Sequence, residues 1–197
     1  MQYIPFEPNI EVNGQTIYAV VDGFRLFRRI ASALLQQEGI GLMRLDGDLE
    51  IDREGWYSQA AWLRAFARIA EEAGTGALFA IGRQIPENAQ FPPTMVDVHT
   101  AIQAIDVAYH LNHRKQGEVM FDHRTHATRE GIGTYGCKLE GPRRITAVCT
   151  NPYPCDFDRG ILTAMARKFE SQAQVDHCGA LACRKHGADS CTYTITW

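Results

Sequence analysis

The sequence predicts an α+β domain in which N-terminal helices pack on one face of a mostly antiparallel C-terminal sheet. Apolar residues recur at helical spacing in the first part of the chain, whereas short alternating stretches dominate after residue 117. Helices followed by strands are typical of this fold class. The 197 residues suffice for one substantial core. We therefore expect a single domain over 1–197, with a mainly helical half over 1–116 and a strand-rich half over 117–197.

The helical half is expected to contain four helices. Residues 1–21 have an extended pattern, with an Asn-Gly turn signal at 13–14. Helical periodicity then predicts helices over 22–38 and 52–73, and the second of these ends at the glycines that follow it. A short third helix ends near residue 85, because Pro86 and the two prolines at 92–93 disfavour its continuation. The fourth helix is predicted over about 95–114.

The strand-rich half shows shorter apolar stretches separated by turn residues. Strands are predicted over 118–121, 133–139 and 144–150, with a turn at 140–143. Asp156 or Asp158 is a suitable cap for a helix that runs to Phe169. Two further strands follow, over about 173–183 and 190–197. The last of them alternates threonines with larger residues, as a half-buried strand does.

Composition and charge exclude several classes of protein. Hydrophobic residues make up 45% and charged residues 22%, which is ordinary for a globular chain. The longest apolar runs, such as Ala77–Ile81, are far shorter than the roughly 20 residues that span a bilayer, and no secretory signal is visible. A net charge of −3 without a basic block argues against nucleic-acid binding. We therefore expect a cytoplasmic protein with no membrane span.

The cysteines are the first unusual feature, because all six lie at or after position 137. In a reducing cytosol such a group serves as metal ligands, as reactive thiols or as small buried hydrophobic residues. Thiolates and imidazoles are the ligands that zinc prefers. The spacing is not that of a zinc finger, since no Cys-x-x-Cys pair occurs. The candidate metal ligands are Cys155, His177, Cys178, Cys183 and Cys191.

Known nucleotide-binding and hydrolase motifs are absent from the sequence, so no catalytic residue is predicted. Histidines elsewhere leave a heme site open. His110 and His113 lie near the end of the fourth predicted helix, and His99 and His123 are further candidates for an axial ligand. The Cys-x-x-Cys-His motif of covalent heme attachment does not occur.

The C-terminal part resembles a 4-vinyl-reductase-type domain over about 118–197. The terminal pattern of a cysteine, seven residues, a second cysteine and an alternating strand is similar to the end of that family. Its members are small-molecule-binding or hydrocarbon-binding sensory modules, some of them in phenol-responsive transcription activators, and they are related in fold to TRAPP subunits. The matching residues are Asn151-Pro152-Tyr153-Pro154-Cys155, Cys183, Gly187-Ala188-Asp189-Ser190-Cys191 and Tyr193-Thr194-Ile195.

The resemblance implies a structural zinc, an apolar pocket and a homodimer. In its phenol-sensing members zinc is held by three cysteines and an acidic residue, which match Cys155, Cys183, Cys191 and, in place of the acidic residue, Ala180. His177 or Cys178 would have to replace that ligand. The pocket would lie between the helices and the sheet, with a few polar groups to orient the ligand. The candidate lining residues are Trp56, Trp62, Phe66, Phe79, Tyr109, His110, His113, Phe121 and Tyr135.

Three functions follow from these observations. The first is a non-enzymatic sensory domain for a small, largely apolar molecule, with a structural zinc and a signalling protein partner. The second is a heme- or iron-binding gas or redox sensor, which a Soret band would reveal. The third is an enzyme, either a small cofactor-dependent reductase or a hydrolase that uses Cys155 activated by His177. A catalytic thiolate needs an electropositive setting, and Asp156, Asp158 and Asp176 nearby oppose it.

Overall fold

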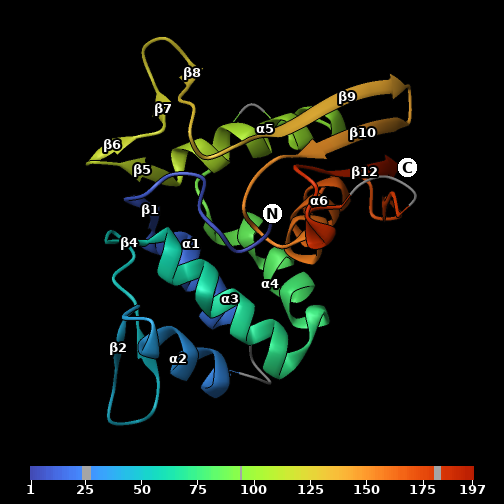
Figure 1. The fold of residues 1–197 in the computed structure, drawn as a ribbon. Helices are drawn as coiled ribbons and strands as arrows, with labels where there is room; N and C mark the ends of the chain where they lie inside the picture. The colour runs from blue at the N-terminus through green and yellow to red at the C-terminus, as the bar shows by residue number, and fades with distance from the viewer. Residues whose placement is uncertain (24–27, 94, 180–182) are drawn as a thin grey trace.

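The computed structural model describes residues 1–23, 28–93, 95–179 and 183–197 (Figure 1). Its fold class is α+β, as predicted. Helices dominate the first half and antiparallel strands the second. The helices are α1 (Gly14–Gly23), α2 (Arg28–Gln37), α3 (Gln59–Ala73), α4 (Thr75–Asn88), α5 (Val98–Leu111) and α6 (Cys155–Arg167), with a 3-10 turn η1 at Arg184–His186.

A small sheet holds the N-terminal half together. Strand β1 (Ile10–Asn13) lies between β4 (Trp56–Ser58) and β5 (His113–Lys115), and β6 (Glu118–Val119) extends the sheet beyond β5. All of these neighbours pair antiparallel. A two-stranded hairpin of β2 (Leu42–Met43) and β3 (Leu49–Glu50) leads from α2 towards β4. The sheet thus joins the start of the chain to the end of α5.

A second sheet forms the C-terminal half, in the order β11-β12-β10-β9. Its strands are β9 (Tyr135–Gly141), β10 (Arg144–Cys149), β11 (Gln174–His177) and β12 (Cys191–Thr196), and every pair is antiparallel. Burial alternates strictly along β12, as its sequence predicts. The hairpin of β7 (Phe121–Asp122) and β8 (Ala127–Thr128) projects away from this sheet (Figure 1).

Two predicted elements are wrong at the N-terminal end. The Asn-Gly pair does not turn a hairpin, because Asn13 Oδ1 accepts a hydrogen bond from the Gln15 amide at 2.8 Å and helix α1 begins at Gly14. An asparagine in this position caps a helix as readily as it forms a turn. Trp56 lies in β4 and not in a helix, and α3 begins only after Ser58. The helix predicted over 22–38 is present as α2 from Arg28, and its residues 24–27 lie outside the described part.

Helix α6 is the element that positions both candidate sites. It packs against α4 where two glycines face each other, Gly82 and Gly160, and a Cβ on Gly160 would lie 2.3 Å from the Phe79 carbonyl oxygen. This contact brings the helix backbones together without intervening side chains. The opposite side of α6 faces β11 and β12 (Figure 1). Within the described residues, none of the helices is both long and apolar enough to cross a bilayer.

Candidate functional site

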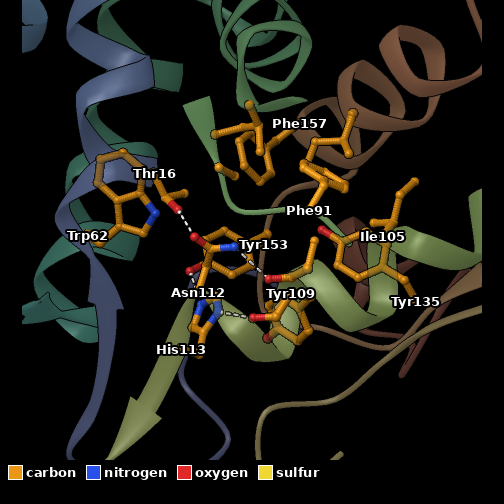
Figure 2. A pocket seen from close by; sticks show the side chains of 14 residues that line it. Thr16, Trp62, Phe91, Ile105, Tyr109, Asn112, His113, Tyr135, Tyr153 and Phe157 are labelled. Atoms are coloured by element: carbon orange, nitrogen blue, oxygen red, sulfur yellow. Dashed lines mark hydrogen bonds between the residues drawn. The ribbon is translucent and has the colours of Figure 1, made fainter. Parts of the chain in front are cut away.

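A small apolar cavity lies between the helical half and the C-terminal half (Figure 2). Its volume, measured as the space open to the centre of a water-sized sphere, is about 40 Å³. Since one water needs roughly 10–15 Å³ on this measure, the cavity has room for only a few atoms. Apolar and aromatic side chains form most of the wall. The lining residues are Thr16, Trp62, Ile85, Ala89, Phe91, Ile105, Ala108, Tyr109, Asn112, His113, Tyr135, Tyr153, Phe157 and Ile161.

The polar groups of the wall are already hydrogen-bonded within the protein. Asn112 Oδ1 accepts from the Thr16 hydroxyl at 3.0 Å, and Asn112 Nδ2 donates to the Ala108 carbonyl at 2.7 Å. His113 Nδ1 lies 2.6 Å from the Tyr109 carbonyl oxygen and donates to it, so Nε2 accepts from the Tyr153 hydroxyl at 2.8 Å. Burial lowers the pKa of His113 to about 3. The imidazole is therefore neutral at physiological pH.

The neutral His113 predicts a loss of stability in acid. Its pKa lies below the unfolded value of about 6.5, so the unfolded chain takes up the proton first as the pH falls. We expect the free energy of unfolding to decrease from about pH 6.5 towards pH 3, by up to about 1.4 kcal/mol per pH unit from this group. Urea unfolding between about pH 7.5 and pH 5 measures this dependence. The free energy of unfolding should fall less steeply with decreasing pH in His113→Gln than in the unchanged chain. Equal slopes in both proteins would contradict this role.

The predicted lining residues separate into two groups. Trp62, Tyr109, His113 and Tyr135 do line the cavity. The others lie outside the lining. Phe66 packs against Trp62, His110 is buried, and Phe121 borders an outer groove. The ring of Phe79 lies under the Arg159 guanidinium, and that of Trp56 lies under the Arg114 guanidinium.

Sequence reasoning missed the lining contributed by Asn112, Tyr153 and Phe157. Tyr153 and Phe157 come from the start of α6 and the loop before it, where no periodic pattern identifies an inward face. Asn112 follows the last residue of α5, and its polar side chain is buried because its amide caps that helix end.

The second candidate site is a cluster of three cysteines and a histidine. One ligand atom from each of Cys155, His177, Cys183 and Cys191 lies within 4.8 Å of the others. The Sγ of Cys155 is 3.3 Å from that of Cys183 and 3.2 Å from that of Cys191. Sulfur ligands of a tetrahedral zinc lie about 3.8 Å apart, as Zn–S bonds of about 2.3 Å require. The four residues come from α6, β11, the start of η1 and β12, so the tertiary fold assembles the cluster.

An unpartnered nitrogen supports metal binding at this cluster. Among the described residues, His177 Nε2 is buried and has no hydrogen-bond partner. Leaving such a group unpaired costs about 1–3 kcal/mol. A metal ion would satisfy the imidazole together with the three sulfur atoms. The donor set of three cysteines and one histidine is a common structural zinc site. The cluster therefore fits zinc.

A buried arginine stabilises negative charge on Cys191. The backbone N–H of Arg184 donates to Cys191 Sγ at 3.3 Å, and its Nε–H donates to the same sulfur at 3.4 Å. The hydrogen bond from Cys155, reinforced by these two donors, lowers the pKa of Cys191 to about 3. The same contact with Cys191, together with burial, raises the pKa of Cys155. The two sulfurs share one proton and Cys191 carries the charge, which disfavours Cys155 as a nucleophile.

Cys178 lies next to the cluster but does not belong to it. Its Sγ is 3.4 Å from the Thr194 hydroxyl, on the neighbouring strand β12. Adjacent residues of an extended segment point to opposite sides, so His177 and Cys178 cannot both face the same ligand. Of the two replacements considered for the missing fourth ligand, His177 is the one that the geometry brings to the cysteines. Cys137 and Cys149 lie on β9 and β10.

Comparison with solved structures identifies the architecture. An H-NOX protein from S. oneidensis in the Fe(II)NO ligation state matches with a TM-score of 0.61 and 14% identity, over 93% of this chain and 97% of that one. An oxygen-binding H-NOX domain related to soluble guanylate cyclases matches with a TM-score of 0.59 and 15% identity, over 93% and 94%. The chain has the H-NOX fold. No family model matches the sequence, and no curated protein matches it significantly.

The H-NOX fold corrects the family resemblance seen in the sequence. The solved structures matched over nearly the whole chain include H-NOX domains, so the assignment to the 4-vinyl-reductase and TRAPP type is wrong. A cysteine-flanked turn followed by an alternating strand describes one local hairpin and carries no information on the fold of the rest of the chain. The match to H-NOX domains covers both halves of the chain, which the hairpin alone could not do.

The H-NOX fold raises the question of whether the cavity fits a heme. An apolar cavity of roughly 150 Å³ takes up benzene, whereas this one measures about 40 Å³. Trp62 and Phe157, almost fully buried, occupy the space beside it. Both ring nitrogens of His113, the imidazole in its wall, are engaged in hydrogen bonds. In the arrangement described, the residues do not fit a porphyrin.

Proposed function

We propose that this protein is a sensory domain of H-NOX architecture that responds to a gas or to redox conditions through a bound metal. The H-NOX fold over nearly the whole chain carries the proposal, since the matching proteins include an NO complex and an oxygen complex. These matches favour the gas or redox sensor over the domain that binds an apolar organic molecule. The metal, its site and the signal it senses belong to the proposal.

The cavity alone is a poor detector of a gas. A diatomic molecule would fill it, but two heavy atoms contribute at most about 3 kcal/mol of binding free energy. That corresponds to a Kd above about 1 mM. Detection at lower concentrations needs either a bond to a metal with an open coordination position or a chemical reaction at a metal-bound thiolate. For this reason the proposal rests on a metal-binding group.

The Cys/His centre, composed of Cys155, His177, Cys183 and Cys191, is the metal site that we propose. The mutual approach of its ligand atoms within 4.8 Å and the unpartnered His177 Nε2 support it. Zinc bound there would hold three sulfurs as thiolates, the form of cysteine that oxidants attack. Arg184 would keep Cys191 charged, and the fold would hold β12 and α6 at a fixed separation. Oxidation of a thiolate would remove one ligand and loosen that connection.

Hemin titration separates this proposal from a heme-based sensor. We expect no Soret band in the purified protein and no saturation at one hemin per chain, because the cavity is too small for a porphyrin. Saturable binding that is lost in His113→Gln and kept in His99→Gln would instead assign a heme to the cavity. His99 is the control because it lies near the start of α5, the helix that precedes His113, and outside the lining.

The predicted homodimer and signalling partner remain predictions. The homodimer was expected from the 4-vinyl-reductase resemblance, which the H-NOX fold replaces. Light scattering of the purified chain at micromolar concentration measures its oligomeric state directly.

A further inference from the structure

A continuous buried polar chain joins the cavity to the Cys/His centre. Tyr135 lines the cavity, and its hydroxyl donates to Asp158 Oδ1 at 2.6 Å. Asp158 Oδ2 accepts from the Arg184 guanidinium, and Arg184 Nε in turn donates to Cys191 Sγ at 3.4 Å. Two residues, Asp158 and Arg184, thus connect a side chain of the cavity wall to a ligand of the proposed metal.

The chain has few ways to relax if one of its members moves. The side chains of Asp158 and Arg184 are fully buried, so water cannot replace a lost partner. Asn151 also fixes the position of Arg184, because its side-chain oxygen accepts a hydrogen bond from Arg184 Nη1 at 2.7 Å. A buried polar group that loses a hydrogen bond is costly, and its neighbours shift to compensate. Displacement of the Tyr135 hydroxyl therefore alters the contact between Asp158 and Arg184.

We propose that Tyr135, Asp158 and Arg184 couple the cavity to the Cys/His centre, so that a molecule that displaces Tyr135 changes how firmly Cys191 holds the metal. This proposal rests on the metal site proposed above. Tyr135 and Asp158 act as positioning residues, since neither belongs to the ligand set. Outer partners of metal ligands commonly change metal affinity by about 10–100-fold when they are removed.

A matched pair of substitutions tests the link. Tyr109 also lines the cavity, but its hydroxyl donates to the Ile132 carbonyl at 2.6 Å and not to Asp158. Tyr135→Phe and Tyr109→Phe each remove one buried hydroxyl from the same wall. The readout is the rate at which the zinc-loaded full chain releases zinc to an excess of chelator. We expect release about ten-fold faster in Tyr135→Phe, and a rate like that of the unchanged chain in Tyr109→Phe.

A substitution that fills the cavity tests whether a change in the cavity alters the release of zinc. Ala108 lines the cavity, and Ala108→Val adds two methyl groups that stand in for a small ligand. We expect Ala108→Val alone to change the rate of zinc release by about five-fold. Added to Tyr135→Phe, it should have no effect on that rate. An equal effect in both backgrounds, or none in either, would overturn the coupling.

The outcomes separate the two proposals. If the protein binds no zinc as purified or after zinc is added, the proposed metal site fails and the coupling fails with it. If zinc binds and Tyr135→Phe releases it at the same rate as Tyr109→Phe, the metal site stands and the coupling is overturned.

Discussion

Replacing Cys191 with serine is expected to abolish metal binding and to lower the free energy of unfolding by about 3–5 kcal/mol. Cys191 is fully buried and contacts Cys155, Cys183 and Arg184 at once. A serine hydroxyl removes the negative charge that faces Arg184 and withdraws one of the metal ligands. Because metal binding contributes directly to folding, both losses add to the destabilisation.

Cys178→Ser is the control for this prediction. It changes the same atom type near the same sheet, but Cys178 contacts Thr194 and is not a member of the Cys/His centre. We expect a change in stability below about 1 kcal/mol. Denaturant unfolding with and without a chelator measures both variants. The chelator should destabilise the unchanged chain and Cys178→Ser but not Cys191→Ser. Equal responses in all three would contradict the metal site.

Gly160→Ala is expected to lower the free energy of unfolding by about 3 kcal/mol. An added Cβ would lie 2.3 Å from the Phe79 carbonyl oxygen and 2.9 Å from Gly82 Cα. Both are backbone atoms of α4, so no side-chain rotation relieves the clash and the two helices must separate. Since α6 carries Cys155 and also lines the cavity with Phe157, this shift would disturb both sites.

Gly76→Ala is the matched control on α4. A Cβ at this position has no heavy atom within 4 Å. Alanine also favours the helix, so we expect the free energy of unfolding to rise by about 0.5 kcal/mol. Thermal or urea unfolding of the two variants is sufficient. If Gly160→Ala were as stable as Gly76→Ala, the close backbone contact described between α4 and α6 would be contradicted.

The secondary-structure pattern predicted the fold class because helix and strand periods differ clearly along this chain. The strands β9, β10 and β12 and helix α6 lie close to their predicted ranges. The division into two separate sheets was not predicted. Strands β1, β4 and β5 are three or four residues long, too short for an alternating pattern, and they pair across long stretches of sequence.

The five candidate metal ligands were predicted from the residue types that zinc prefers. The tertiary fold brings four of them together and leaves out Cys178. Sequence spacing alone could not choose between His177 and Cys178, because both follow strand-forming residues. The structure brings His177 to the cysteines and turns Cys178 towards Thr194. Arg184 had no signal in the sequence. An arginine followed by Lys185 and His186 in a polar turn is normally exposed, and the buried partners Asp158 and Asn151 explain its position.

The cavity lining was only partly predictable. Aromatic residues at helical spacing pack into a core far more often than they line a cavity, so Phe66 and Trp62 could not be told apart. The two rings in fact pack against each other, tilted by 52° with centroids 4.6 Å apart, and of the two only Trp62 lines the cavity. That distinction depends on tertiary contacts, since Phe66 packs against the Tyr153 and Phe157 rings from a distant part of the chain, which no local pattern encodes.

Elemental analysis of the protein purified without an affinity tag or a chelator tests the central claim most directly. The account predicts about one zinc per chain, retained in Cys178→Ser and lost in Cys191→Ser, as a tetrahedral site of three cysteines and one histidine requires. A chain that contains no metal, or one that contains iron together with a Soret band and keeps it in Cys191→Ser, would contradict it.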